Sequence, residues 1–166
     1  MSNMHIREYT WVGIEVAVNS IAMQMFKDEW RPDYIVGITR GGLVPAVLLS
    51  HATDIPMKTL CVQLESKGLD ENTERNAEMA KHALKEYKKI LIIDDINRGG
   101  DAMQWIQNDW QDAMGFAGDY TPEQWHTNVR FASLIDNPNS KVPMDYCNEE
   151  IDLDEENIWV EFPWES

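Results

Sequence analysis

The apolar positions in the first part of the chain predict a helix, a buried strand and a second helix, in that order. The run Tyr-Ile-Val-Gly-Ile at 34–38 is almost wholly apolar, which is typical of a strand buried on both faces. A second helix is expected over 43–49, where Pro45 lies in the first turn and costs no backbone hydrogen bond. The first helix is predicted from apolar residues at helical spacing, namely Trp11, Ile14, Val18, Ile21 and Met25.

The same alternation continues farther along the chain. A helix is expected over 77–87, and the apolar run 90–93 after it is the clearest strand of the sequence. A third helix carries Met103, Ile106 and Trp110 on one side. The remaining predicted segments are a strand at 58–64, a mobile polar surface loop at 66–76 and a strand at 129–135.

Strands that alternate with helices at this spacing indicate an α/β fold, in which a parallel sheet is covered by helices on both faces. The chain has 166 residues, the usual size of one domain, and 43% of them are hydrophobic, enough for one core. We therefore expect a single domain over 1–166. Ligands of such folds bind beyond the carboxyl ends of the strands, where glycine pairs follow two of the predicted strands.

The two glycine turns are candidates for phosphate binding. Each lies between a buried strand and a helix, so unpaired backbone N–H groups and the positive end of the helix dipole meet there. Two such turns in one short domain suggest a ligand with two separate phosphate groups. The alternative is that the glycines serve only tight packing. The residues concerned are Thr39, Arg40, Gly41 and Gly42 in the first turn and Gly99 and Gly100 in the second.

Two adjacent acids, Asp94 and Asp95, end the strand at 90–93. Neighbouring carboxylates at the end of an apolar strand lose hydration and repel each other unless a cation or a diol engages them. Magnesium and the two hydroxyl groups of a sugar are suitable partners. The alternative is a solvated loop start, where acids are common.

The net charge of the chain indicates which classes of binding partner to expect. With 29 acidic against 14 basic residues its formal net charge is -15, which argues against nucleic acid, because that partner requires a basic face. A phosphate ligand must then be held by local backbone amides, a few arginines and a divalent cation, so magnesium is the expected cofactor.

The ends and cysteines of the sequence bear on its location. The start, MSNMHIREYT, lacks the basic and apolar segments of a secretory signal, and no apolar run is long enough to span a membrane. Cys61 and Cys147 form no C-x-x-C motif. These features predict a cytoplasmic protein with no membrane partner.

Three separated motifs resemble a known family. The run ILIIDD before a glycine turn resembles the phosphoribosyl-diphosphate signature of type I phosphoribosyltransferases. ITRGGLVPAVLL resembles the diphosphate loop of the bacterial xanthine-guanine branch, and the tail IWVEFPW resembles the end of its purine-covering hood. The resemblance implies a type I core with a small C-terminal hood, contributed mainly by about 136–166, and a homodimer or homotetramer.

The resemblance also implies roles for individual residues. The first glycine turn would hold the diphosphate, with a cis peptide at Arg40–Gly41, and Arg40 and magnesium would stabilise this leaving group. Asp94 and Asp95 would bind the ribose hydroxyls and position magnesium. The loop from Ser66 to Arg75 would close over the site. The 5′-phosphate would be surrounded by Asn97, Arg98, Gly99, Gly100, Asp101 and Ala102, and the base would be bound by the Trp159 ring and the Val160 backbone.

The second turn departs from the family pattern. Relatives commonly have Asp-Thr-Gly-Gly-Thr where this chain has Arg98 to Ala102, so the acid has become Arg98 and both threonines are lost. Arg98 is a candidate replacement phosphate ligand and Asp101 a candidate for the missing catalytic carboxylate. Relatives acting on 6-oxopurines also use a lysine near the start of the hood; none lies near Leu134, and Lys141 is the closest downstream. The alternative for Trp159 is an ordinary position in the hydrophobic core.

Three functions remain in competition. The first is transfer of the phosphoribosyl group of phosphoribosyl diphosphate to a nucleobase, with a purine favoured, in nucleotide salvage. The second is a non-catalytic regulatory protein of the same fold that binds phosphoribosyl diphosphate or a nucleotide, which the altered loop would explain. The third, a magnesium-dependent phosphatase or nucleotide hydrolase on another α/β fold, accounts for the acid pair and not for the first glycine turn.

Overall fold

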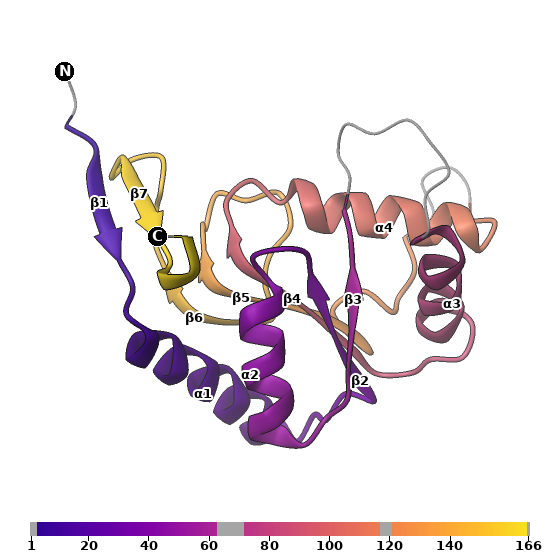
Figure 1. Cartoon of the computed structure of the whole chain (residues 1–166). Coiled ribbons are helices and arrows are strands. Elements are labelled where there is room, and N and C mark those ends of the chain that lie inside the picture. The colour runs from indigo at the N-terminus through magenta and orange to yellow at the C-terminus, as the bar shows by residue number, and fades with distance from the viewer. Residues whose placement is uncertain (1–2, 63–71, 117–120, 166) are drawn as a thin grey trace.

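A five-stranded parallel sheet forms the centre of the molecule in the computed structural model, which describes residues 3–62, 72–116 and 121–165 (Figure 1). The strand order is β3-β2-β4-β5-β6, and each neighbouring pair is parallel. The predicted parallel sheet is thus confirmed. Its strands are β2 (Tyr34–Ile38), β3 (Met57–Leu60), β4 (Ile90–Asn97), β5 (Val129–Asp136) and β6 (Tyr146–Glu150).

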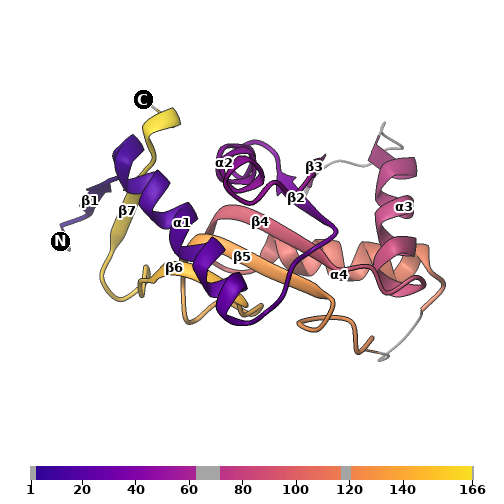
Figure 2. The same ribbon diagram turned by 90° about the horizontal axis from the view of Figure 1, so that it is seen from below.

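Helices cover both faces of this sheet, also as predicted (Figures 1 and 2). One face packs against α1 (Trp11–Lys27) and α2 (Leu43–Thr53). The other packs against α3 (Asn72–Leu84) and α4 (Asp101–Ala113). Neighbouring residues of one strand point to opposite faces, so Ile35 of β2 lies in the first core and Val36 in the second.

A small second sheet joins the two ends of the chain. It pairs β1 (His5–Glu8) with β7 (Ile158–Glu161) in parallel, and a short 3-10 helix (Pro163–Glu165) follows (Figure 1). The Tyr9 hydroxyl donates to Glu149 Oε2 of β6 over 2.5 Å, and Arg7 pairs with Glu149 Oε1 over 2.6 Å. These polar contacts attach the small sheet to the edge of the large one.

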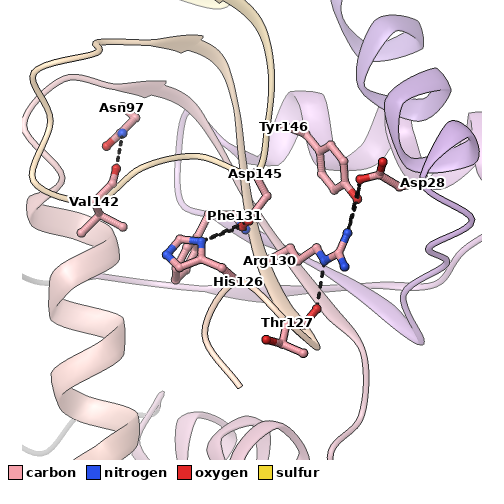
Figure 3. A network of polar contacts seen from close by, with 9 residues as sticks. All are labelled: Asp28, Asn97, His126, Thr127, Arg130, Phe131, Val142, Asp145 and Tyr146. Carbon is pink, nitrogen blue, oxygen red and sulfur yellow. Dashed lines mark hydrogen bonds and ion pairs between the residues drawn. The ribbon is translucent and has the colours of Figure 1, made fainter. Parts of the chain in front are cut away.

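Polar contacts also fix the amino-terminal end of β5. The Arg130 guanidinium donates to the carbonyl of Thr127 over 2.9 Å and to the Tyr146 hydroxyl over 2.7 Å, and the Tyr146 hydroxyl donates to Asp28 over 2.9 Å (Figure 3). The guanidinium also lies 4.7 Å from the centre of the Trp30 ring. This cluster ties the end of α1 to β5 and β6, far from the carboxyl ends of the strands.

Several predicted boundaries are wrong. Helix α3 begins at Asn72, so the last part of the predicted loop 66–76 is helical; the rest of that loop lies outside the described residues. Asn76, in the second turn of this helix, is buried and accepts from the Trp110 indole. This polar residue at a core position interrupts the apolar period there. The same helix ends at Leu84 instead of 87. Strand β3 ends at Leu60, and the predicted residues beyond 62 are not described.

Trp11 is a further correction. It belongs to the predicted apolar stripe of α1 but is 53% exposed. The reason is its place at the start of the helix, where its ring lies 6.0 Å from that of Trp164. The other four residues of the stripe are buried. Across the described residues, no helix is long and apolar enough to cross a membrane.

Candidate active site

The first glycine turn connects β2 to α2. Gly42 packs so tightly against the Ile38 and Ile93 backbones that a Cβ atom would approach the Ile93 carbonyl oxygen to 2.5 Å. Gly42 is also the residue before α2, and no side chain caps this end of the helix. The packing interpretation of this turn therefore applies to Gly42, while amides at the start of α2 are free of side-chain partners.

Gly41 has a different neighbour, the Asp95 carboxylate. A Cβ atom on Gly41 would overlap that carboxylate, so the loop backbone lies in direct contact with the acid pair. This contact follows from the register of the sheet, since Gly37 of β2 pairs with Ile93 of β4 and the two chains continue side by side beyond that point. Arg40, next to Gly41, is exposed.

The cis peptide of this loop is Thr39–Arg40, and the predicted position at Arg40–Gly41 is wrong by one residue. The resemblance identified the loop, whereas the bond is fixed by the path of the backbone from Ile38 to the close-packed Gly42. Thr39 itself is held by the sheet, because its amide donates to the Leu60 carbonyl over 2.9 Å.

Asp94 and Asp95 lie within β4, so the prediction that this strand ends at 93 is wrong; the strand continues because it stays paired with β5 as far as Asn97. Each carboxylate accepts from a backbone amide, and the two side chains also contact each other. Asp94 Oδ1 accepts from the Asp95 amide over 2.8 Å, and Asp95 Oδ1 accepts from the Ile96 amide over 2.8 Å. No described lysine, arginine or histidine forms an ion pair with either group. Burial, followed by the charge of Asp95, raises the pKa of Asp94 well above its usual range, and burial also raises the pKa of Asp95.

Such a pair fits a divalent cation. Two adjacent carboxylates without a basic partner supply hard oxygen ligands, and a cation would relieve the cost that raises their pKa values. One oxygen of each carboxylate accepts from a backbone amide, and a metal or a sugar hydroxyl would replace the contact between the two side chains. The predicted metal ligands therefore suit magnesium in chemistry and in position.

The second glycine turn forms a pocket of about 180 Å³ with Asp94. The pocket is lined by Asp94 and by residues 96–103 at the start of α4. Gly100 has a φ of 87°, which favours glycine, and a Cβ atom there would collide with Ser140 and Val142. Gly99 by contrast faces open space, and no side chain caps α4. The predicted phosphate-loop residues thus lie around one small pocket at an uncapped helix start.

Two of these loop residues are already engaged. Asn97 is buried, and its side chain donates to Asp136 over 2.8 Å and to the Val142 carbonyl over 2.9 Å (Figure 3). Asp101 forms an ion pair with Lys141. Lys141, to which the sequence assigned no role, thus contacts Asp101 in the second glycine turn.

The C-terminal sheet brings Trp159 to the same region. Trp159 is 52% exposed, so its alternative as a core residue is wrong; its neighbour Val160 is buried and pairs with Arg7 of β1. The Arg98 guanidinium lies 6.0 Å from the centre of the Trp159 ring. Trp164, partly buried, stacks on Phe162 at 4.7 Å. The structure therefore brings the three sequence motifs to one place.

Sequence reasoning missed Asn137. This residue is only 2% exposed, its side chain donates to the Arg98 carbonyl over 2.8 Å, and its amide donates to the Asn97 carbonyl over 2.9 Å. It fixes the second glycine turn to the segment after β5. A signal was present, because Asp136 and Asn137 follow the apolar run of β5 just as the acid pair follows that of β4.

A larger pocket, of about 750 Å³, lies at the opposite edge of the sheet. Its wall comes from the end of α1, the end of α2 and Ile55 before β3, and includes Met23, Phe26 and Trp30. The motif residues contribute nothing to it. The candidate active site is consequently the smaller, polar region at the carboxyl edge.

These features define an α/β protein whose candidate site combines an acid pair, two glycine turns and an exposed indole. The model of the phosphoribosyl transferase domain matches residues 9–166. The chain therefore belongs to the phosphoribosyltransferase family.

Solved structures share this fold over most of the chain. A purine phosphoribosyltransferase from Pyrococcus horikoshii is 23% identical, with a TM-score of 0.65 and coverage of 98% of this chain and 95% of that one. The xanthine-guanine-hypoxanthine phosphoribosyltransferase of Helicobacter pylori is 18% identical, with a TM-score of 0.67 and coverage of 97% and 94%. A hypothetical protein of Neisseria gonorrhoeae with bound ppGpp is 17% identical, with a TM-score of 0.69 and coverage of 100% and 92%.

Proposed function

We propose that this protein transfers the phosphoribosyl group of phosphoribosyl diphosphate to a nucleobase, with a purine favoured, as a step of nucleotide salvage. The observation that carries the proposal is the contact of Gly41 with Asp95, because it joins the diphosphate loop to the acid pair. Membership of the family and the fold shared with purine phosphoribosyltransferases support the reaction class.

Each part of the ligand has a matching part of the site. In the first glycine turn the Arg40 and Gly41 amides and the Arg40 guanidinium bind the diphosphate. The Thr39 and Gly42 amides are already used, because they donate to backbone carbonyls. The acid pair offers carboxylate oxygens to the ribose hydroxyls and to magnesium, which supplies charge stabilisation of the leaving diphosphate when bound. The pocket at the start of α4 receives the 5′-phosphate, and Trp159 stacks on the base.

The step itself needs little from protein side chains beyond charge and position. The ring nitrogen of the base forms a bond to the anomeric carbon while the bond to the diphosphate oxygen breaks with its electron pair, and the base gives up one ring N–H proton to solvent. Arg40 stabilises the charge that appears on the leaving group. We further propose that β1 and β7 together cover the base, that Asp101 acts through its ion pair with Lys141 to hold the loop, and that the protein works in the cytoplasm as a dimer or tetramer.

A regulatory function is the second candidate. The altered loop favours it, since Arg98 and Ala102 replace the acid and a hydroxyl that relatives use in catalysis. The bound ppGpp in the Neisseria gonorrhoeae protein is in keeping with a nucleotide at such a site. In this case the same residues bind phosphoribosyl diphosphate or a nucleotide without turnover.

One experiment separates the two candidates. The protein is incubated with magnesium, phosphoribosyl diphosphate and each common nucleobase in turn, while binding heat and released diphosphate are recorded. Release that depends on the base supports the transferase. Binding without release supports the regulator, and absence of both overturns the proposal. The same measurements are made on Asp94→Asn, which removes one charge of the acid pair. Glu15→Gln, at an exposed acid on α1 away from the site, is the charge-matched control.

A further inference from the structure

The backbone around Arg98 is fixed by the segment that follows β5. Asn137 donates its side-chain amide to the Arg98 carbonyl over 2.8 Å, and the Lys141 amide donates to the Gly99 carbonyl over 3.2 Å. Gly100 packs against Ser140 and Val142. The backbone from which the exposed Arg98 side chain extends is therefore held in place by this segment.

That side chain is directed to the base site. The guanidinium lies 6.0 Å from the centre of the half-exposed Trp159 ring, and Arg98 forms no ion pair with the residues the structure describes. Nearby acids have other partners: Asp101 pairs with Lys141, and Asp154 accepts from Asn137 over 3.2 Å. A guanidinium without a counter-ion next to a stacking surface suits an acceptor-rich or anionic ligand.

The chemistry of Arg98 is opposite to that of the acid it replaces. A carboxylate accepts a hydrogen bond or a proton from a ring N–H, whereas a guanidinium has five donors, no acceptor and a permanent charge. A nucleobase stacked on the Trp159 ring must therefore present a lone pair or a negative charge to the Arg98 guanidinium. A ring N–H at that position would face another donor.

We propose that Arg98 is the specificity-determining residue of the base site and that it holds the nucleobase as a ring-nitrogen anion. This inference rests on the proposed function. The base loses its ring proton to solvent before the transfer. The negative charge is shared by the two nitrogens of the five-membered ring, so one of them accepts from Arg98 while the other bonds to the anomeric carbon. The electron pair of the breaking carbon–oxygen bond leaves with the diphosphate. No proton has to be accepted inside the site, which accounts for the loss of the acid.

A preference among bases follows. The additional carbonyl of a dioxopurine such as xanthine makes its ring N–H more acidic than that of hypoxanthine, so the class expected here is an easily ionised oxopurine. A guanidinium carries a permanent charge, so ionisation of the base itself sets the pH dependence. Other charged or titratable groups on the surrounding elements are Asp94, Asp95, Asp101, Lys141, Asp152, Asp154, Glu161, His5 and Arg7.

The test measures protons released when a base binds. The protein is first saturated with magnesium and a carbocyclic analogue of phosphoribosyl diphosphate, which cannot form the sugar cation. Xanthine or hypoxanthine is then titrated in at a pH below its ring ionisation, in two buffers of unequal ionisation enthalpy. We expect close to one proton released per xanthine bound, and binding that strengthens as the pH rises toward the ionisation of the base.

Variants of Arg98 provide the specific readout. Arg98→Gln is expected to reduce the ratio of xanthine to hypoxanthine affinity roughly 10- to 100-fold, the range for one lost charge-assisted hydrogen bond. Arg98→Lys retains part of the ratio because it keeps the charge, and Arg98→Asp abolishes proton release. Arg31→Gln, on an arginine that contacts Thr53 and Asp54 at the opposite edge, leaves the ratio unchanged.

The outcomes distinguish this inference from the proposed function. If the analogue binds with magnesium but xanthine releases no proton and Arg98→Gln leaves the ratio unchanged, the role of Arg98 is overturned and the transferase site stands. If the analogue gives no magnesium-dependent heat at all, both are overturned.

Discussion

Gly41 and Asp95 follow different strands of the sheet, yet the glycine lies directly against the carboxylate and leaves no room for a Cβ atom between them. The contact exists because β2 and β4 are parallel neighbours and release their loops at the same edge. It makes the diphosphate loop and the acid pair parts of one site. Glycine is required at 41 for space, since its φ lies outside the left-handed region.

Gly41→Ala tests this relationship. The added methyl group must displace the Asp95 carboxylate or the loop, so we expect a destabilisation of about 1–3 kcal/mol and loss of magnesium-dependent binding of phosphoribosyl diphosphate. Thermal unfolding and calorimetry measure the two effects. Gly99→Ala is the matched stability control, because its Cβ atom meets nothing within 4 Å. Equal stability of the two variants would show that the contact is absent.

The acid pair predicts a gain in stability when one charge is removed. Folding raises the pKa of Asp94, so above its usual value the folded protein binds more protons than the unfolded chain, and metal-free stability falls as the pH rises through that window. Asp94→Asn should therefore increase the free energy of unfolding near pH 7 without magnesium, by about 1 kcal/mol or more. Denaturant unfolding across pH checks this, with Glu15→Gln as the control. A less stable variant would contradict the interpretation.

His82 predicts a pH effect of opposite sign, remote from the site. Its Nδ1 lies 2.9 Å from the Tyr34 hydroxyl, and burial followed by the charge of Lys88 lowers its pKa. Between that lowered pKa and its ordinary value near 6.5 the unfolded chain binds more protons, so stability falls as the pH falls through this range. His82→Gln should flatten this part of the stability curve, whereas His51→Gln, at an exposed position, should not.

The hydrogen bond from Tyr9 to Glu149 predicts how firmly the small sheet is attached. Tyr9→Phe removes a donor from a partly buried carboxylate that keeps only Arg7, and we expect a loss of about 1–2 kcal/mol in stability. The hydroxyl of Tyr87, whose side chain is 57% exposed, provides the comparison. Tyr87→Phe should change stability by less than about 0.5 kcal/mol. A similar effect of both substitutions would mean that the Tyr9 contact contributes no stability.

The core of the fold could be predicted from the sequence because its strands are apolar on both faces. Ile90 to Ile93 and Tyr34 to Ile38 have no polar interruption, and their alternation with helices indicates a parallel sheet covered on both faces. The strands β1, β6 and β7 were missed, since none has a regular apolar pattern. All of β1 is exposed, β6 is mostly half-buried at the sheet edge, and β7 has one buried residue. Their place depends on partners distant in sequence.

The candidate site could be predicted as three motifs but not as contacts. The acid pair and the first glycine turn are visible in the sequence because each directly follows an apolar run, and the second glycine turn because it precedes a predicted helix. Pairing of Asp101 with Lys141, anchoring of the Arg98 carbonyl by Asn137, and the approach of Arg98 to Trp159 depend on where the chain after β5 returns. The turn DNPNS at 136–140, which follows the apolar run of β5, gives no local indication of that path.

The most direct measurement of the central claim is calorimetric titration of phosphoribosyl diphosphate into the full chain with and without magnesium. We predict saturable one-to-one binding with magnesium, much weaker binding without it, and loss of the magnesium-dependent part in Asp94→Asn but not in Glu15→Gln. Binding that is unaffected by magnesium and by Asp94→Asn, or no binding at all, would contradict a phosphoribosyl-diphosphate site built on the acid pair and the first glycine turn.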